Sequence, residues 1–217
     1  MIIVTGRQTL ELDAAELDRL ARDYRELVID LGTGDGRFAL EQARRRPDAL
    51  VVGIDPVAEA MAELAGRTRR KRGLQPNLLF VVASAEQPPE ELTGRADELF
   101  VILPWGSLMR GLILGEPDVL AGIAMLCKPG ATITALLNTR IYADPVPLEA
   151  RDLPDLTPEY VRADLAPQLA AAGLVVVQAG QLPPEELRAL PSTWAKRLSH
   201  RTPPPTFRML LRAANPL

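Results

Sequence analysis

Residues 27–36, LVIDLGTGDG, decide the fold of this chain. The apolar run ends in glycines at alternate positions, Gly32, Gly34 and Gly36, and helical spacing follows near residues 37–46. A strand, a glycine-rich turn and a helix in this order are typical of an open α/β sheet, which binds its ligand at the carboxyl ends of the strands. Because further unbroken apolar runs alternate with helical segments, the sequence predicts a mostly parallel sheet with helices on both faces.

The rest of the chain extends this pattern to a single α/β domain, residues 1–217, with a seven-stranded sheet. We expect an N-terminal β-hairpin within 1–13 and two insertions, 142–158 and 181–205, before and after the sixth strand. The expected strands are 27–32, 50–55, 78–84, 99–104, 131–138, 174–180 and 206–214. The expected helices are 14–25, 37–46, one opened by Pro56 and running towards Arg72, 118–128 and 158–172.

Composition narrows the class of protein. The chain has 217 residues, of which 47% are hydrophobic, and this suits one compact domain. No apolar run reaches the roughly 18 residues of a membrane span, and the N-terminal apolar stretch is too short for a signal peptide. One cysteine, Cys127, and one histidine, His200, argue against a disulfide framework and a zinc site. We expect a cytoplasmic protein without a metal, in which Cys127 is a packing residue and His200 a surface or phosphate-contacting residue.

The net charge of −3 hides a strong asymmetry. The last thirty residues, 188–217, contain six basic residues and no acid, and a second acid-free run spans 67–72. A charge run is ordinarily a solvated face. Two acid-free clusters on an otherwise acidic chain favour a side of the molecule that faces a polyanion.

The glycine-rich turn is compatible with two classes of cofactor, and Asp30 separates them. A dinucleotide site requires a third glycine where this chain has Arg37. A carboxylate at Asp30 would also repel a pyrophosphate by roughly 4 kcal/mol at 4 Å in an effective dielectric of 20. The same carboxylate suits a ligand that carries an ammonium group and a sulfonium, as S-adenosylmethionine does.

Two further acidic positions support this cofactor. Asp55 ends the second strand, where an acid accepts both ribose hydroxyls, and Ser84-Ala85-Glu86 follows the third strand, where the adenine would lie. The alternative is that Asp30 and Asp55 only cap helices or turns. The combined pattern favours the class I S-adenosylmethionine-dependent methyltransferases, which have a Rossmann-like fold, over the dehydrogenases.

The chain has two tryptophans, and both fall in expected loops. Trp105 follows the fourth strand in Leu103-Pro104-Trp105-Gly106, beside the expected cofactor cleft, and Trp194 lies in the proline-rich stretch near Lys196 and Arg197. The alternative for Trp105 is an ordinary core tryptophan. Two indoles from separate loops can clamp one flipped base, with stacking worth roughly 1–3 kcal/mol per base.

Five motifs together resemble one known family. The runs IDLGTGDGR (29–37), GIDPV (53–57), AE (85–86), LPWGSL (103–108) and STWAKRL (192–198) are similar to the Kam/Npm-type 16S rRNA (adenine(1408)-N(1))-methyltransferases of aminoglycoside resistance. The resemblance covers nearly the whole chain. LPWG together with WAKRL is far more specific than the glycine-rich turn.

The resemblance implies a role for each matching residue. Asp30, Gly32 and Gly34 would hold the methionine part of S-adenosylmethionine, Asp55 the ribose, and Ala85 with Glu86 the adenine. Trp105 and Trp194 would sandwich the target adenine, with Pro104 and Ser107 beside it. The walls of the methyl-transfer pocket would be Ile102, Leu103, Pro104, Trp105, Gly106, Ser107, Ser192, Thr193 and Trp194.

The resemblance also implies a substrate, 16S rRNA within the small (30S) ribosomal subunit, and an enzyme that acts as a monomer. The residues expected to contact RNA are Arg67, Arg69, Arg70, Lys71, Arg72, Lys196, Arg197, Arg201 and Arg208. The segment 199–206, which contains TPPP, departs from the family. The group that holds the flipped nucleotide's phosphate is therefore left open between Arg201 and Arg208.

Two other functions fit parts of the sequence. A small-molecule methyltransferase would use the same cofactor site but would not need two basic clusters. A ribosome-binding factor without catalysis would not need Asp30, Gly32 and Asp55 intact. For the adenine reaction no strong general base is expected, because adenine N1 carries an in-plane lone pair and needs only alignment with the methyl group.

Overall fold

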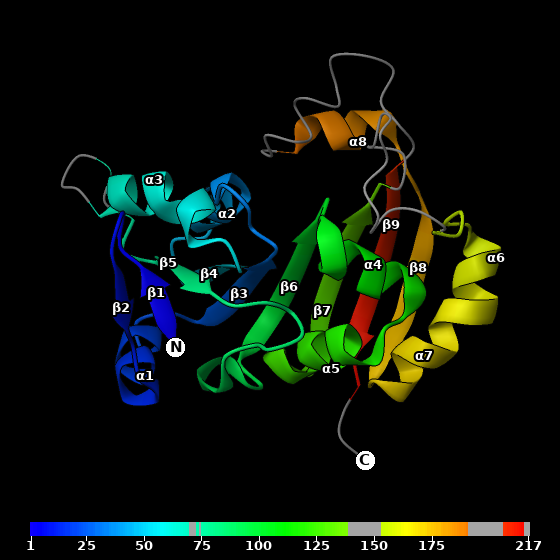
Figure 1. Cartoon of the computed structure of the whole chain (residues 1–217), viewed down its shortest axis with the longest axis horizontal. Helices are drawn as coiled ribbons and strands as arrows, with labels where there is room; N and C mark the ends of the chain where they lie inside the picture. The colour runs from blue at the N-terminus through cyan, green and yellow to red at the C-terminus, as the bar shows by residue number, and fades with distance from the viewer. Residues whose placement is uncertain (70–72, 74, 139–152, 191–205, 215–217) are drawn as a thin grey trace.

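The fold is a single twisted sheet with helices on both faces (Figure 1). The computed structural model describes residues 1–69, 73, 75–138, 153–190 and 206–214. Within these residues the sheet has nine strands in the order β2-β1-β5-β4-β3-β6-β7-β9-β8. The strands are β1 (Ile2–Val4), β2 (Thr9–Glu11), β3 (Glu26–Leu31), β4 (Ala49–Asp55), β5 (Leu78–Val82), β6 (Ala96–Ile102), β7 (Cys127–Leu137), β8 (Leu174–Leu182) and β9 (Thr206–Ala213).

The seven strands β3 to β9 form the expected open sheet. Strands β5, β4, β3, β6 and β7 run parallel, and β9 lies antiparallel between β7 and β8. The expected count of seven is wrong in one respect, because the N-terminal hairpin joins the same sheet. Strand β1 pairs with β5 at Ile3 and Val81, so it covers an edge that would otherwise leave backbone groups unpaired.

The helices follow the prediction with shifted ends. They are α1 (Ala14–Ala21), α2 (Arg37–Arg45), α3 (Ala58–Thr68), α4 (Gly106–Leu114), α5 (Pro117–Leu126), α6 (Pro158–Tyr160), α7 (Ala166–Ala171) and α8 (Pro184–Ala189), with a short helix η1 (Glu90–Leu92). The prediction that Pro56 opens a helix is wrong. The Asp55 carboxylate accepts the Val57 N–H at 2.9 Å, and α3 begins only at Ala58.

Two helical features were not expected. Helix α4 follows Trp105 directly, in a stretch that the sequence places in a loop. The expected helix 158–172 contains a π-helical turn, η3 (Val161–Leu165), between α6 and α7. The Tyr160 hydroxyl donates to the Ile113 carbonyl at 2.8 Å, which joins this helical run to the end of α4.

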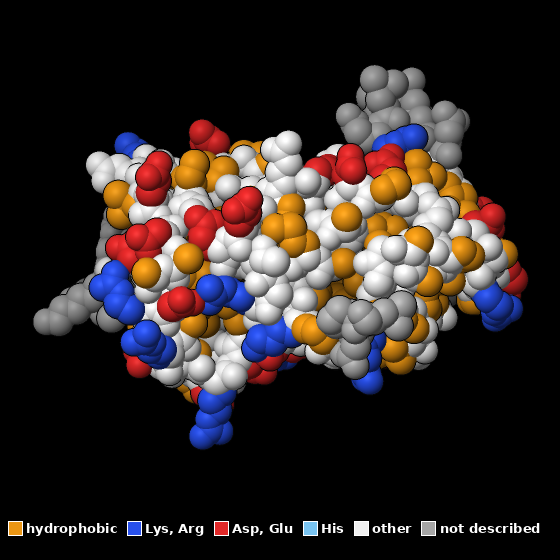
Figure 2. All heavy atoms as spheres, turned by 90° about the horizontal axis from the view of Figure 1, so that it is seen from below, with side chains coloured by type: hydrophobic (Ala, Val, Ile, Leu, Met, Phe, Trp, Pro, Cys, Tyr) orange, Lys and Arg blue, Asp and Glu red, His pale blue; other side chains and the backbone are white. Residues whose placement is uncertain are grey.

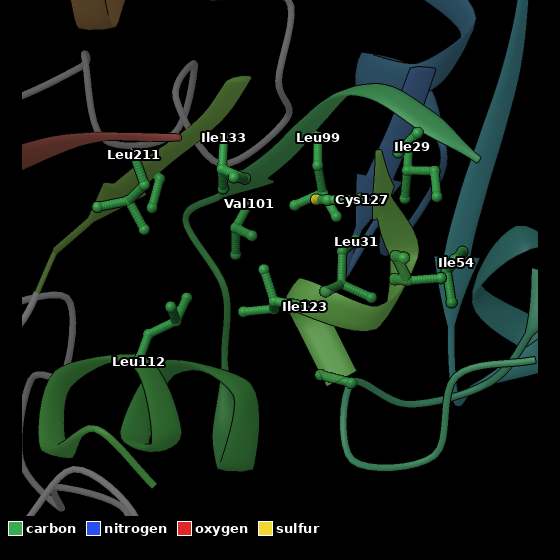
Figure 3. Close-up of a cluster of buried hydrophobic side chains, with 14 of the residues drawn as sticks. Ile29, Leu31, Ile54, Leu99, Val101, Leu112, Ile123, Cys127, Ile133 and Leu211 are labelled. Carbon is green, nitrogen blue, oxygen red and sulfur yellow. The ribbon is translucent and has the colours of Figure 1, made fainter. Parts of the chain in front are cut away.

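The core has one cluster on each face of the sheet. On one face α1, α4, α5 and α7 contribute side chains such as Leu112 and Ile123, which point towards Leu31 and Val101 of the sheet (Figure 3). Cys127 lies in the same cluster, and burial raises the pKa of its thiol to about 12, which fits the expected packing role. On the other face α2 and α3 cover the sheet.

A third apolar cluster joins α8 to the ligand-binding edge of the sheet. It contains Phe38, Ile102, Leu103, Leu136, Leu182 and Leu187. Of the two expected insertions, only the end of 142–158 and the start of 181–205, including α8, lie in the described residues. None of the described helices is long and apolar enough to span a membrane.

The turn between β3 and α2 depends on Gly36. Its φ of +75° lies in the left-handed region, and a Cβ there would stand 2.4 Å from a ring carbon of Phe80. Phe80 belongs to the core cluster under α2 and α3, so the ring has little room to move. Only glycine lets α2 start this close to β5.

We predict that Gly36→Ala destabilises the protein more than Gly94→Ala does. Both glycines have positive φ, but Gly94 has open space around its Cα, so its substitution costs only the backbone strain of about 1–2 kcal/mol. The contact with Phe80 adds about 1–3 kcal/mol for Gly36→Ala. Urea unfolding of both variants measures the difference, and equal losses would contradict the Phe80 contact.

Candidate functional site

The site is a pocket of about 520 Å³ at the carboxyl ends of β3, β4, β5 and β6. This is the edge at which an open α/β sheet binds its ligand. The lining residues are 30–35, 38, 55–57, 83–86 and 102–108.

Most of the site residues expected from the sequence meet in this pocket. Those present in the lining are Asp30, Gly32, Gly34, Asp55, Ala85, Glu86, Ile102, Leu103, Pro104, Trp105, Gly106 and Ser107. The expected Ser192, Thr193 and Trp194 lie outside the described residues. Thr33, Phe38 and Leu108 also line the pocket and were missed. Thr33 could have been found from its place inside the glycine-rich turn, whereas Phe38 and Leu108 carry no signal that separates them from core residues.

The carboxylate of Asp30 lies at the floor of the pocket and is only 1% exposed. The pKa of Asp30 is raised to about 7, chiefly by burial and also by the nearby Asp55 and Asp35 carboxylates. Hydrogen bonds from the Thr33 hydroxyl, at 2.5 Å, and from the Ala39 backbone oppose this rise in pKa. The site thus holds a buried acid that titrates near neutral pH and gains from a cationic partner.

The glycine-rich turn is held by the neighbouring strand β4. The backbone N–H groups of Gly32 and Thr33 both donate to the Ile54 carbonyl, at 2.8 and 2.9 Å. The Gly34 N–H donates to the Asp55 carboxylate at 2.9 Å. Gly34 has a φ of +55° and open space where a Cβ would stand. The turn therefore presents bare backbone to the pocket beside an acid.

Glu86 connects the turn after β5 with the start of α4. Its side chain accepts hydrogen bonds from Ser107 and Ser84, and the Ser107 bond is the main cause that lowers the pKa of Glu86. These bonds link two loops of the pocket through one carboxylate.

The part of the pocket lining that follows β6 contains a residue with a strained backbone conformation. Leu103 has a φ of +52°, the only positive value among the described residues that are not glycine. Its N–H donates to the Leu136 carbonyl at 2.8 Å, and Leu103 is 2% exposed, so packing holds the strained conformation. Trp105 follows at the N-cap of α4 and is 38% exposed, which rules out the alternative of a core tryptophan.

The charge of the pocket selects among ligands. Its ionisable lining residues, taken from the described part of the chain, are all acids: Asp30, Asp35, Asp55 and Glu86. Such a lining repels a pyrophosphate and attracts a ligand with an ammonium and a sulfonium group. The buried acid at Asp30 and the open backbone at Gly34 fit the amino-acid part of S-adenosylmethionine, and the Asp55 carboxylate fits its ribose.

The expected RNA-contacting residues are only partly described. Arg67 and Arg69 lie at the end of α3, and Arg208 lies on β9 opposite Leu136, at the same end of the sheet as the pocket. Arg208 pairs with Glu186 of α8 at 2.8 Å. Helices α3 and α8 lie on the same side of the sheet in Figure 1. Arg70, Lys71, Arg72, Lys196, Arg197 and Arg201 lie outside the described residues.

The side of the molecule opposite to α3 and α8 carries both signs of charge. Figure 2 shows acidic and basic side chains on this face, with hydrophobic side chains between them and no large area of one sign. In the described part of the chain no cluster of His, Cys, Asp and Glu has the size to hold a metal ion.

The sheet order, the glycine-rich turn and the acidic pocket define a class I S-adenosylmethionine-dependent methyltransferase with a Rossmann-like fold. The chain matches the family model described as NpmA: 16S rRNA (adenine(1408)-N(1))-methyltransferase over residues 2–212. The protein belongs to this family.

Individual relatives agree over nearly the full chain. A 16S rRNA (adenine(1408)-N(1))-methyltransferase of Streptoalloteichus hindustanus is 40% identical over 198 residues, which cover 90% of this chain and 91% of the relative. One from Escherichia coli is 31% identical over 202 residues, 92% of each chain. The crystal structure of a mutant of the enzyme from Catenulisporales acidiphilia with cosubstrate SAM superposes with a TM-score of 0.92 and 39% identity, covering 100% of this chain and 98% of that one.

We predict a bell-shaped pH dependence for the binding of S-adenosylmethionine. With a pKa of about 7, Asp30 is mostly protonated at pH 6, so the affinity should fall about sixfold between pH 7.5 and pH 6. Above about pH 8 the ligand's α-amino group, whose ordinary pKa is about 7.8, loses its charge and the affinity falls again. Calorimetric titration across pH 5.5–9 measures both limbs of this curve: the acidic limb, on which affinity falls as the pH is lowered, and the alkaline limb, on which it falls as the pH is raised.

Two controls isolate the Asp30 carboxylate. Asp30→Asn should remove the acidic limb and weaken binding at pH 7.5 by at least about tenfold. Binding of 5′-methylthioadenosine, which lacks the ammonium group, should vary little with pH. An unchanged acidic limb in Asp30→Asn would contradict the assignment.

Proposed function

We propose that this protein transfers a methyl group from S-adenosylmethionine to N1 of adenine 1408 in 16S rRNA of the small ribosomal subunit, and so confers aminoglycoside resistance. The observation that carries the proposal is the combination in one pocket of an acidic cofactor floor and an exposed tryptophan at its rim. Family membership over residues 2–212 supports the reaction and the substrate.

The cofactor is assigned to the floor and one wall of the pocket. Asp30 accepts from the ammonium group, the turn at Gly32 and Gly34 lies along the methionine part, and Asp55 accepts from the ribose hydroxyls. Ala85 and Glu86 contact the adenine. S-adenosylmethionine supplies an electrophilic methyl group on its sulfonium.

The target base is assigned to the rim. Trp105 is 38% exposed and lines the pocket with Pro104 and Ser107, and Trp194 is proposed as the second wall of the sandwich, beside Ser192 and Thr193. Ile102, Leu103 and Gly106 complete the walls. Flipping a base out of the RNA stack costs a few kcal/mol, and stacking on two indoles offsets this cost.

The protein's own groups have to align the reactants rather than remove a proton. Adenine N1 has an in-plane lone pair and is mostly unprotonated at pH 7, so methyl transfer needs no general base. The pocket fits this requirement, because its described ionisable residues are acids that stabilise positive charge and none is a histidine or a lysine. The strained backbone at Leu103 leads directly to Trp105, whose indole sets the plane of the base. Methyl transfer requires that N1 lie about 3–3.5 Å from the methyl group.

RNA docking is assigned to the two basic clusters. Arg67 lies in the last turn of α3, and Arg69, Arg70, Lys71 and Arg72 come after this helix in the sequence. Lys196, Arg197, Arg201 and Arg208 lie in and after the segment 181–205. The position of α3 and α8 on one side of the sheet supports a common surface. We also propose that the chain is one domain, that the segments 142–158 and 181–205 face the substrate, and that the enzyme works as a cytoplasmic monomer.

A small-molecule methyltransferase is the second candidate. The exposed Trp105 at the pocket rim also suits a small aromatic substrate. That function leaves the acid-free runs 67–72 and 188–217 without a role. A factor without catalysis is disfavoured by the intact set Asp30, Gly32 and Asp55 in one pocket.

The direct test is primer extension on 16S rRNA after small ribosomal subunits are incubated with the protein and S-adenosylmethionine. A methyl group on N1 blocks Watson–Crick pairing, so reverse transcriptase should stop next to adenine 1408. No stop, with cofactor binding intact, would favour the small-molecule candidate. No cofactor binding would leave only a factor without catalysis.

We predict that Trp105→Ala lowers methyl transfer by roughly 5- to 150-fold, the equivalent of about 1–3 kcal/mol of stacking, with little change in subunit docking. Trp105→Phe should recover part of the rate, because the smaller ring still presents a face. The measurements are methyl incorporation into small subunits and a melting curve for each variant. A melting temperature that falls in parallel with activity would show that the tryptophan only stabilises the fold.

The clamp itself requires the second tryptophan. Trp194→Ala should lower the rate of methyl transfer to a similar extent. The activation free energy of the double variant should rise by less than the sum of the two single increases, because a base with one wall missing is already misaligned. Normal transfer by either single variant would rule out the clamp.

We predict that reversing the charges of Arg69, Arg70 and Lys71 weakens docking to small subunits and leaves the affinity for S-adenosylmethionine unchanged. Phosphate contacts position a protein on RNA, and wild-type docking should weaken steeply with added salt. Filter binding at several salt concentrations measures this. Docking that is insensitive to salt, or a fully active triple variant, would contradict the proposed surface.

A further inference from the structure

Thr33 is a pocket residue whose side chain has no role in the function described so far. It lies between Gly32 and Gly34, lines the pocket and is 8% exposed. Its hydroxyl donates to Asp30 Oδ2 at 2.5 Å. This is the one side-chain hydrogen bond that the structure gives to the buried carboxylate among the described residues.

We propose that Thr33 is a positioning residue, whose hydroxyl group holds the Asp30 carboxylate charged and oriented for the ammonium group of the cofactor. This inference rests on the proposed cofactor, and it adds a residue that acts through Asp30 rather than on the ligand. An ionised carboxylate has about four acceptor positions, so the bonds from Thr33 and from the Ala39 backbone leave capacity for an ammonium donor.

The backbone around Thr33 fixes the direction of its hydroxyl. The Thr33 N–H donates to the Ile54 carbonyl at 2.9 Å, and its own carbonyl accepts from the Gly36 N–H at 3.0 Å. Gly53 of β4 lies against the side chain, and a Cβ at Gly53 would stand 2.9 Å from the Thr33 hydroxyl oxygen. A side chain at position 53 would therefore collide with the Thr33 hydroxyl, and glycine leaves room for it.

The charges around Asp30 explain why a donor is needed there. Burial penalises the charged form most, and Asp55 at the end of β4 and Asp35 in the turn add repulsion. Glu86 lines the same pocket, and no described lysine, arginine or histidine does. Before the cofactor binds, the hydrogen bonds of Thr33 and of the Ala39 backbone are what favour the charged carboxylate.

The test compares Thr33→Ala with Thr33→Ser, which differ only in the hydroxyl group. For the wild type and Thr33→Ser we expect the acidic limb of S-adenosylmethionine binding to lie near pH 7. For Thr33→Ala we expect this limb to move up by about one pH unit, and the affinity at pH 7 to fall about fivefold. Calorimetry in buffers of different ionisation enthalpy should also show more protons released on binding at pH 7.

A purely structural role predicts a different result. If Thr33 only stabilised the turn, Thr33→Ala would weaken S-adenosylmethionine and 5′-methylthioadenosine equally at every pH, and the limb would not move. That outcome, or identical limbs for Thr33→Ala and Thr33→Ser, overturns the inference. Failure of the wild type to bind S-adenosylmethionine would overturn the proposed function and this inference together, whereas failure to methylate RNA with normal binding would overturn only the function.

Discussion

The burial of one carboxylate constrains the rest of the site. Asp30 sits at the end of the central strand β3 with 1% of its surface exposed, and its pKa rises to about 7 as a result. A carboxyl group in such a place makes the apo protein less stable as the pH rises from about 4 to 7, because the folded state resists ionisation that the unfolded chain undergoes freely. The turn that follows is built to offset this cost, and a cationic ligand offsets it further.

The structure supplies that compensation through backbone geometry. Thr33 can donate to Asp30 only because the turn is fixed by the Ile54 carbonyl on β4, and because Gly53 leaves room for the hydroxyl. The second acid, Asp55, is in turn held by the Gly34 and Val57 N–H groups. The two acids proposed to hold the cofactor are therefore both oriented by the same short turn, whose entry into α2 depends on Gly36.

Much of this could be predicted from the sequence, because strand ends and turn residues carry local signals. The five parallel strands, the acids at Asp30 and Asp55 and the wall after β6 follow from apolar runs and from the residues that end them. The pairing of Ile3 with Val81 could not be predicted, since it joins segments that no local pattern relates. Helix α4 was missed because its residues, GSLMRGLIL, are apolar on most sides and include two glycines.

The reason for those glycines appears only in three dimensions. A Cβ at Gly111 would stand 2.4 Å from Val119 of α5, so the glycine permits the close approach of α4 and α5 on which the helix depends. The π-helical turn at Val161–Leu165 is likewise a feature of packing and not of local propensity. It follows Tyr160, whose hydroxyl bonds the last turn of α4.

Helix α4 also connects the proposed base platform with the proposed cofactor wall. Its N-cap residue is Trp105, the proposed base platform, and its first turn carries Ser107, which donates to Glu86 in the cofactor wall. The strained Leu103 joins this helix to β6, which pairs with β3, the strand that carries Asp30 near its end. Methyl transfer needs an alignment that a shift of about 1 Å would spoil, and a platform on a loop of its own would not provide it. Because Asp30 and Asp55 lie on β3 and β4, a displacement of α4 would move the proposed base platform relative to the proposed cofactor acids. The bond between Ser107 and Glu86 and the packing of Leu103 oppose such a displacement.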